Sequence, residues 1–278
     1  MKFGTMTFLT TPADCDEKFG TLRKNGFDAC QLIYKPEVYT DEAAKIVKEK
    51  AEYYGIDISA QFAGFRDAEI AWYDTRYLAN TLGIGVPAYR HERMKYLRSA
   101  ISFASKAGIP DVVIHAGYLP TNLMSQEYAD MLVAVEAAAK CCQNNGVNLL
   151  LETGTEVPII LKALIQDIGR DNVFINFDPA NILMYGFGNP VDALTVFGKY
   201  VRNMHGKDGC LPTDPRHFGE EKAVGKGMVD FAGVFAKFRE IGYDRYCIIE
   251  REISGEEQLR DILSAKVYLE DLWKKSQP

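Results

Sequence analysis

Residues 148–178 read NLLLETGTEVPIILKALIQDIGRDNVFINFD, and each end of this stretch is a short apolar run that stops at a carboxylate. The first run, Asn148–Glu152, is apolar throughout its middle, as expected for a strand that is covered on both faces. The second run, Val173–Asp178, follows after a longer connection. Short apolar runs that alternate with longer segments of helical period indicate parallel strands linked by helices.

The same alternation continues through the chain in both directions. Further apolar runs predict strands at Lys2–Phe8, Ala29–Tyr34, Asp57–Phe62, Asp111–His115, Val201–His205 and Tyr246–Glu250. Eight strands interleaved with helices, without a break in composition, predict an α/β protein in which residues 1–278 form a single (β/α)8 TIM-barrel domain. An open doubly wound sheet usually has fewer strands, and no G-x-G-x-x-G motif follows the first strand.

Between the strands, apolar residues recur at steps of three and four, which is the helical period. Three clear stripes are Met94, Leu97, Ile101 and Ala104; Met131, Leu132, Val135 and Ala139; and Phe231, Val234, Phe235 and Phe238. Gly108 follows the first stripe and Gly242 the third, each in a position that helix C-caps prefer. A final helix is expected at roughly Glu256–Lys275.

The composition argues against several classes of partner. The formal net charge is −6 and no run of Lys or Arg stands out, so we expect no nucleic acid and no anionic membrane as a partner. No segment approaches the ~18 apolar residues that a membrane span needs, and the N-terminus lacks a signal-peptide pattern. The six cysteines contain no C-x-x-C pair, which favours a reduced, cytoplasmic protein.

Five of the predicted strands end at an ionisable residue. These residues are His115, Glu152, Asp178, His205 and Glu250. The carboxyl ends of parallel barrel strands open onto one face, where TIM barrels carry their active sites, so the five side chains are expected to surround a common point. A single carboxylate at a strand end is most often part of an ion pair or a loop cap, but the register of the set favours a functional site.

Three carboxylates in one partly dry pocket repel each other strongly unless a cation is present. We therefore predict that Glu152, Asp178, His205 and Glu250 bind one divalent metal ion. A ligand set of mostly oxygen with one nitrogen suits Mn²⁺, Mg²⁺ or Co²⁺, and Zn²⁺ is also compatible. For His115, direct substrate contact, metal ligation, a hydrogen bond to a ligand carboxylate and a buried structural role all remain open.

This ligand set predicts a reaction. A divalent ion beside a sugar carbonyl and its neighbouring hydroxyl would stabilise an enediolate. Glu152 and Glu250 come from strands on either side of the ion, so one glutamate can remove a proton from the carbon next to the carbonyl while the other returns it. Return to the opposite face gives epimerisation, and return to the adjacent carbon gives isomerisation.

Two predicted connections are too long to be simple turns. Ala63–Arg90 follows the third strand and contains Trp72, Tyr73 and Tyr77, and Gly206–Val229 follows the seventh strand. Loops of this length in a compact domain are usually functional. Polar residues of the second loop are Lys207, Asp208, Arg216, His217, Glu220 and Lys226. His91 is expected at the surface, whereas His217 is equally compatible with an exposed position and with a position facing the site.

Several segments together resemble the xylose isomerase-like TIM-barrel superfamily of sugar phosphate isomerases and epimerases. They are Val-Val-Ile-His115-Ala-Gly, Leu-Glu152-Thr-Gly, Asp178-Pro-Ala-Asn181, Met-His205-Gly-Lys207-Asp208, Gly-Lys-Gly-Met-Val-Asp-Phe231 and Ile-Ile-Glu250-Arg-Glu. The resemblance covers nearly the whole chain. It implies a metal bound by Glu152, Asp178, His205 and Glu250, and in the ketose 3-epimerases the two glutamates are also the acid/base pair.

The resemblance also bears on substrate contacts. Ketose 3-epimerases have a substrate-binding His where this chain has Asn181, and an Arg where it has Leu211, so Lys207 or Arg216 is the candidate replacement. The predicted substrate-binding residues are His115, Asn181, Lys207, Arg216 and Glu156. The ligand is expected to be a small sugar or polyol, and the resemblance makes a homo-oligomer possible.

Three functions remain open at this stage. The first is a sugar, polyol or keto-acid isomerase or epimerase. The second is a dehydratase of an inosose or keto-acid that uses the same deprotonation, and the third is a non-catalytic sugar-binding barrel. The endonuclease branch of the superfamily needs further metal ligands where this chain has Asn181 and Gln61, so a role in DNA repair is not expected.

Overall fold

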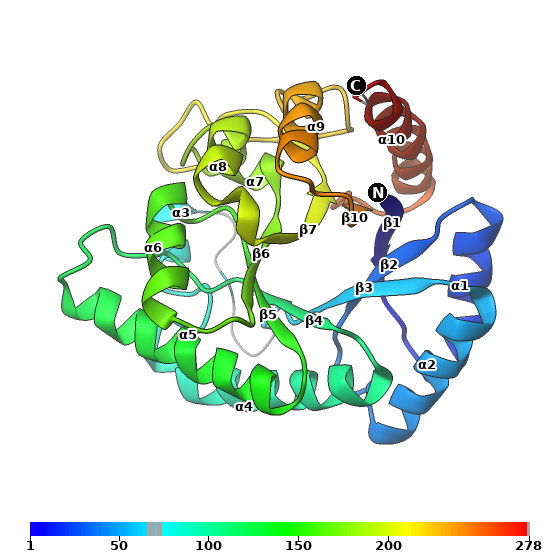
Figure 1. Cartoon of the computed structure of the whole chain (residues 1–278), viewed down its shortest axis with the longest axis horizontal. Coiled ribbons are helices and arrows are strands. Elements are labelled where there is room, and N and C mark those ends of the chain that lie inside the picture. The colour runs from blue at the N-terminus through cyan, green and yellow to red at the C-terminus, as the bar shows by residue number, and fades with distance from the viewer. Residues whose placement is uncertain (66–69, 71–73, 277–278) are drawn as a thin grey trace.

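The computed structural model describes residues 1–65, 70 and 74–276. In this part of the chain, eight parallel strands close into a barrel in the order β1-β10-β7-β6-β5-β4-β3-β2 (Figure 1). The strands are β1 (Lys2–Thr7), β2 (Ala29–Ile33), β3 (Asp57–Phe62), β4 (Asp111–Ile114), β5 (Asn148–Glu152), β6 (Val173–Phe177), β7 (Val201–Gly206) and β10 (Tyr246–Ile249). The predicted TIM barrel is confirmed, and each predicted strand ends within one residue of its observed bounds.

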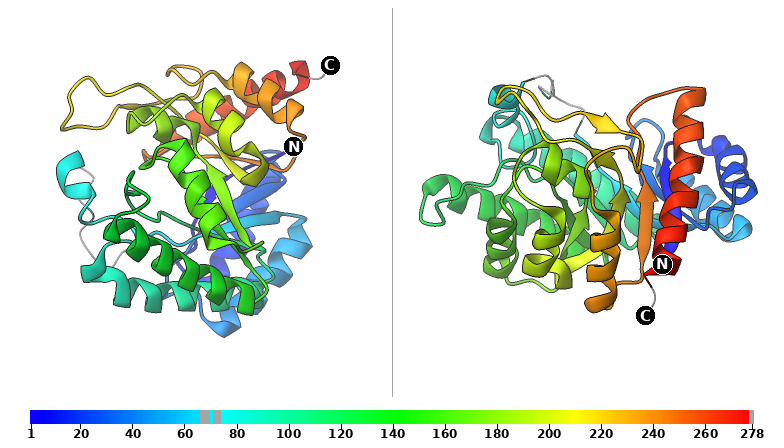
Figure 2. Two further views of the ribbon diagram at one scale, coloured as in Figure 1. Left: turned by 60° about the vertical axis from the view of Figure 1, so that its left-hand side comes forward. Right: turned by 90° about the horizontal axis from the view of Figure 1, so that it is seen from above.

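Helices surround the barrel, as the views in Figure 2 show. The long ones are α1 (Cys15–Lys24), α2 (Asp41–Tyr54), α4 (Pro87–Ala107), α5 (Gln126–Asn144), α6 (Pro158–Ile168), α8 (Pro190–Phe197), α9 (Phe231–Glu240) and α10 (Glu256–Lys275). Shorter helices are α3 (Thr75–Leu78), α7 (Pro179–Met184) and the 3-10 turns η1 (Pro12–Asp14) and η2 (Gly198–Tyr200). In the described part of the chain, no helix combines the length and apolar character needed to cross a membrane.

The start of α4 corrects the predicted bounds of the loop after β3. The prediction extended this loop to Arg90, but the helix already begins at Pro87. Proline is favoured in the first turn of a helix because its missing N–H would have no intrahelical partner there. The helix ends as predicted at Gly108, whose φ of 72° is the left-handed conformation that glycine adopts without strain.

The strand period of two separates the two sides of the barrel wall. On β5, Leu149 and Leu151 belong to the large core between strands and helices, whereas Leu150 packs inside the barrel with Ala60 and Val113. Glu152 lies two residues beyond Leu150 and therefore shares its inward face. The same spacing places an ionisable side chain above the barrel interior on each neighbouring strand.

The two long loops meet above this end of the barrel. The amide N–H of Thr75, at the start of α3, donates to the carbonyl of Arg216, and its hydroxyl donates to the carbonyl of Pro215. The loop after β7 contains an unpredicted antiparallel ribbon, β8 (Asp208–Gly209) with β9 (Glu221–Lys222). Of the aromatic residues expected in the first loop, Tyr77 is exposed, and Trp72 and Tyr73 lie outside the described residues.

Candidate active site

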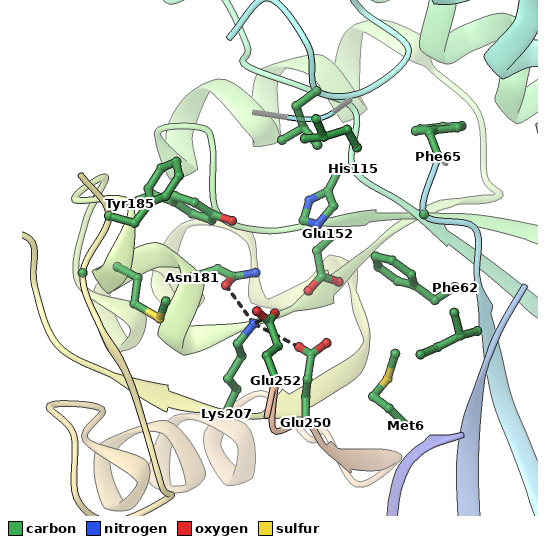
Figure 3. A pocket seen from close by; sticks show the side chains of 17 residues that line it. Met6, Phe62, Phe65, His115, Glu152, Asn181, Tyr185, Lys207, Glu250 and Glu252 are labelled. Atoms are coloured by element: carbon green, nitrogen blue, oxygen red, sulfur yellow. Dashed lines mark hydrogen bonds and ion pairs between the residues drawn. The ribbon is translucent and has the colours of Figure 1, made fainter. Parts of the chain in front are cut away.

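The four predicted metal ligands lie together at the carboxyl end of the barrel. Nδ1 of His205 is 3.0 Å from Oε1 of Glu152, 3.1 Å from Oε2 of Glu250 and 3.6 Å from Oδ2 of Asp178. Glu152, Asp178 and His205 are buried, and Glu250 is partly open to the cavity above them. Figure 3 shows the carboxylates of Glu152 and Glu250 directed toward each other in this cavity.

The donor set fits a divalent cation. One ligand atom from each residue lies within 4.8 Å of all the others, and two ligands on opposite sides of an ion such as Mg²⁺ are about 4 Å apart. Nδ1 of His205 faces the three carboxylates, and within the described part of the chain Oδ2 of Asp178 has no hydrogen-bond partner. Buried polar atoms are rarely left without a partner, so Oδ2 of Asp178 points to a bound group between the four side chains.

A polar layer below the site fixes the orientation of His205. Nε2 of His205 lies 3.0 Å from Oε1 of Gln31, and the side-chain nitrogens of Gln31 and Asn203 both donate to Oδ1 of Asn176. Nδ2 of Asn176 in turn donates to Glu152. The sequence analysis did not identify these three amides. Each of the three is a polar residue on the inward face of an otherwise apolar strand, and this pattern could have revealed them. Asn176 and Asn203 also lie two residues before a predicted metal ligand on the same strand.

Asp178 is held by the start of α7. Its Oδ1 accepts from the backbone N–H of Asn181, which makes Asp178 the N-cap of that helix, and its own backbone N–H donates to the hydroxyl of Thr153. The cap engages one carboxylate oxygen and leaves Oδ2 facing the other ligands. Local backbone chemistry therefore aims this side chain at the site.

The electrostatics of the cluster depend on the balance between burial and charge. Burial opposes a charged imidazole, but the surrounding Glu152 and Glu250 carboxylates outweigh it and raise the pKa of His205 well above its usual value. Burial also raises the pKa of Glu152, to about 7. Burial acts in the same direction on Glu250, yet the nearby Lys207 and His205 outweigh it and lower the pKa of Glu250.

Lys207 is a buried cation beside the ligand cluster. Its Nζ is 3.3 Å from Oε2 of Glu250 and 3.7 Å from Oδ2 of Asp178, and it donates to Glu252 and to Oδ1 of Asn181 (Figure 3). Burial disfavours its charge, but Glu250 and Glu252 outweigh that cost and raise the pKa of Lys207. Lys207 therefore stays charged and compensates part of the negative charge of the site.

A cavity of about 670 Å³ opens above the cluster. Its polar lining includes His115, Asn181 and Lys207, which the sequence analysis predicted to contact substrate, and Glu152 and Glu250 are also part of it. Burial, followed by the charge of Lys207, lowers the pKa of His115 to about 4, so its imidazole is neutral at pH 7. Sequence reasoning missed Tyr185, Phe62 and Glu252, which also line the cavity.

Three other candidates lie elsewhere among the described residues. Arg216 and His217 are exposed on the loop after β7, and His217 pairs with Asp214. Glu156 is buried, where it accepts a hydrogen bond from the N–H of Gly154, and burial raises its pKa to about 8. None of the three lines the cavity.

Comparison with known proteins places the chain in a family. The model of the xylose isomerase-like TIM barrel family matches residues 19–271. The chain belongs to this family. A solved structure of a xylose isomerase domain protein from Planctomyces limnophilus is 30% identical, covers 99% of this chain and 98% of its own, and superposes with a TM-score of 0.89.

Two more distant relatives extend the comparison. An uncharacterized protein of Methanocaldococcus jannaschii is 24% identical over 290 residues, which is 98% of this chain and 89% of that protein. The structure of a D-tagatose 3-epimerase-like protein is 23% identical, covers 99% of this chain and 98% of its own, and has a TM-score of 0.74. At that level of identity, the likeness to the epimerase-like structure concerns the fold.

Proposed function

We propose that the protein is a divalent-metal-dependent sugar isomerase or epimerase that transfers a proton through an enediolate. The observation that carries the proposal is the pair Glu152 and Glu250, whose carboxylates lie 3.0 Å and 3.1 Å from the same nitrogen of His205 and line one cavity. Mn²⁺, Mg²⁺ or Co²⁺ suits three carboxylates and one imidazole, and Zn²⁺ is compatible. When bound by Glu152, Asp178, His205 and Glu250, the cation would polarise the substrate carbonyl.

The two glutamates are proposed to move the proton. The pKa of Glu250 is lowered, so its carboxylate is charged at neutral pH and can accept a proton from the carbon next to the carbonyl. Glu152 faces Glu250 across the cluster and is the group proposed to return the proton. Delivery to the opposite face of the same carbon would give the epimer, and delivery to the adjacent carbon the isomer.

Recognition of a small sugar or polyol is proposed to rest on the polar lining. Lys207 carries N–H donors, Asn181 carries an amide, and the neutral His115 offers a ring nitrogen toward hydroxyl groups. Apolar side chains such as Phe62 and Phe65 cover the remaining wall and exclude water from the reacting atoms. A few convergent polar groups in a mostly apolar pocket are typical of small-molecule sites.

The reducing cytoplasm is the proposed location. All six cysteines are free thiols, and Cys15, Cys30, Cys142 and Cys247 are buried. Proteins that keep unpaired cysteines are typical of reducing compartments.

The test is solvent deuterium incorporation. The Mn²⁺-loaded protein is incubated in D2O with a panel of ketoses, and label at the carbon next to the carbonyl is followed by NMR. Glu152→Gln and Glu250→Gln should each reduce incorporation by about 10²–10⁴-fold, the usual contribution of a general acid or base. The exposed Glu49→Gln serves as the control and should keep full exchange. Full exchange in both site variants would overturn the proposal.

A further inference from the structure

The last helix of the ring, α10, has one buried face and one open face. Its inner face carries Ala265, Leu269 and Trp273, which are spaced by four residues and belong to the core. The helix packs mainly against α9, β1 and β10. The right-hand view of Figure 2 shows this red helix on the outside of the ring, with no other described segment in front of it. Its outer face is therefore open to a partner.

The middle of this outer face is apolar. The exposed fraction is 69% for Val267 and 42% for Tyr268, and the half-buried Leu263 lies one turn before Val267. Together with Ser264 and Asp271, these side chains line one hollow on the surface. The solvent side of a helix normally carries polar residues, so an apolar cluster at this place indicates a surface that binds another protein.

The charged residues around this apolar centre follow a definite order. Read from the start of α10, the outer positions are acidic, basic, apolar, acidic and basic. They are Glu256 and Glu257, then Arg260, then Leu263 and Val267, then Asp271, and last Lys274 and Lys275. The same order read backwards has the opposite charge at every charged place. Two copies of α10 that run in opposite directions therefore bring acid against base throughout, whereas two parallel copies would set like charges together.

The spacing of these residues supports an antiparallel pair. Arg260, Val267 and Asp271 are separated by seven and four residues, so they lie on one side of the helix. Arg260 and Asp271 are equally far from the point between residues 265 and 266, at about 8 Å for a rise of 1.5 Å per residue. A two-fold axis through this point places Arg260 of each copy beside Asp271 of the other, and the two apolar centres cover each other.

Within one copy, these charges are only weakly engaged. Arg260 lies 3.6 Å from Glu256, and Lys275 lies 2.6 Å from Asp271. All four side chains are more than half exposed. Exposed ion pairs of this kind contribute little to stability, so sharing them with a second copy has a small cost.

We infer that the outer face of α10 is the contact surface between two copies of this chain, which pack antiparallel about a two-fold axis. The inference is independent of the proposed reaction. The 20 residues of α10 span about 30 Å, and a contact along one helix is small for a specific interface, so the dimer is expected to dissociate on dilution. Salt screens the charge pairs at its rim and should favour the monomer.

The test is sedimentation velocity of the full chain over roughly a hundredfold range of concentration, because dimerisation follows mass action. Val267→Arg places one positive charge from each copy at the centre of the contact. Val133→Arg makes the same change at a similarly exposed position of α5 and serves as the control. Arg260→Asp and Asp271→Arg each set like charges side by side, and the double variant restores opposite charges with their positions exchanged. Circular dichroism checks that each variant is folded.

We expect a dimer whose dissociation constant rises by about tenfold or more in Val267→Arg and stays unchanged in Val133→Arg. Arg260→Asp and Asp271→Arg should each weaken the dimer, and the double variant should recover most of the lost affinity. A chain that stays monomeric at every concentration would overturn the inference, even if another protein binds α10. So would a dimer that Val267→Arg leaves intact, or a double variant that is as weak as the two single variants.

Discussion

Nε2 of His205 lies 3.0 Å from Oε1 of Gln31, an amide carried by β2 on the other side of β10 and β1. An amide oxygen accepts hydrogen bonds and cannot donate them, so a proton on Nε2 satisfies this contact, and the amide nitrogen of Asn176, 3.1 Å from the same Nε2, has Glu152 as its own acceptor. The proton that a cation displaces is therefore the one on Nδ1, whose lone pair then faces the space that Glu152 and Glu250 share. The tautomer that a metal ligand needs is thus set by a residue that does not touch the metal position.

Replacement of Gln31 tests this relationship. Gln31→Leu removes the acceptor, and loss of such an outer partner typically weakens metal binding by about 10–100-fold. A Mn²⁺ titration followed by electron paramagnetic resonance measures the affinity. Gln61→Leu is the matched control, because Gln61 is an equally buried amide that donates to the carbonyl of Ala100 instead. Equal affinity in the two variants would contradict the role of Gln31.

Metal binding is expected to release protons. Burial opposes the charged form of His205, but the neighbouring carboxylates raise its pKa well above the usual value, so the metal-free imidazole is protonated at pH 7. A cation must displace that proton, and metal affinity therefore falls as the pH is lowered. Calorimetric titration in two buffers of different ionisation enthalpy should show at least one proton released per ion. Identical heats in both buffers would exclude this linkage.

The sequence was sufficient for the barrel and for the metal-site candidates, because both follow from local patterns. Each strand is an apolar run, and parallel strands bring their carboxyl ends to one face whatever the details of packing. Glu152 and His205 could therefore be assigned to one point without knowing their distance. The ends of the last five strands were recoverable to one residue, since an ionisable side chain interrupts each of these apolar runs.

The rest of the site depends on tertiary contacts that no local pattern records. Gln31 contacts His205 only because β2 and β7 face each other across the barrel. Arg216 was a reasonable candidate by its position in the loop after β7, yet the turn of that loop leaves it exposed, while Phe218 lines the cavity. Glu252 lies two residues beyond Glu250 and reaches Lys207 because the chain leaves the barrel there.

The loop after β7 is expected to depend on Asp208. Its carboxylate accepts hydrogen bonds from the backbone N–H groups of Gly209, Gly225, Gly227 and Val229, at 2.8 to 3.1 Å. Asp208→Ala leaves these four donors without their acceptor, and the bonds from Gly209 and Val229 are buried, so the substitution should lower the free energy of unfolding by about 3 kcal/mol. Urea denaturation measures the change, and proteolysis should cut this loop faster.

A control variant on the same loop tests whether the effect of Asp208→Ala comes from the lost hydrogen bonds or only from the removal of a negative charge. Asp214 accepts a single backbone hydrogen bond, from Arg216 on the exposed side. Asp214→Ala should change the free energy of unfolding by less than about 0.5 kcal/mol, as surface substitutions usually do. Similar losses of unfolding free energy in the two variants would show that the hydrogen bonds to Asp208 do not stabilise the loop.

Lys207 is expected to set the pH range of the reaction through Glu250. Its Nζ lies 3.3 Å from Oε2 of Glu250, and its charge, with that of His205, outweighs burial and lowers the pKa of that carboxylate. In Lys207→Met this pKa rises, so more Glu250 is protonated at a given pH and cannot accept the substrate proton. The acid limb of the plot of kcat/KM against pH should therefore move to higher pH.

Lys222→Met, which removes a lysine paired with the exposed Glu220 of the same loop, should leave the acid limb in place. A profile that only scales downward in Lys207→Met, without moving along the pH axis, would mean that Lys207 acts on binding and not on the proton affinity of Glu250.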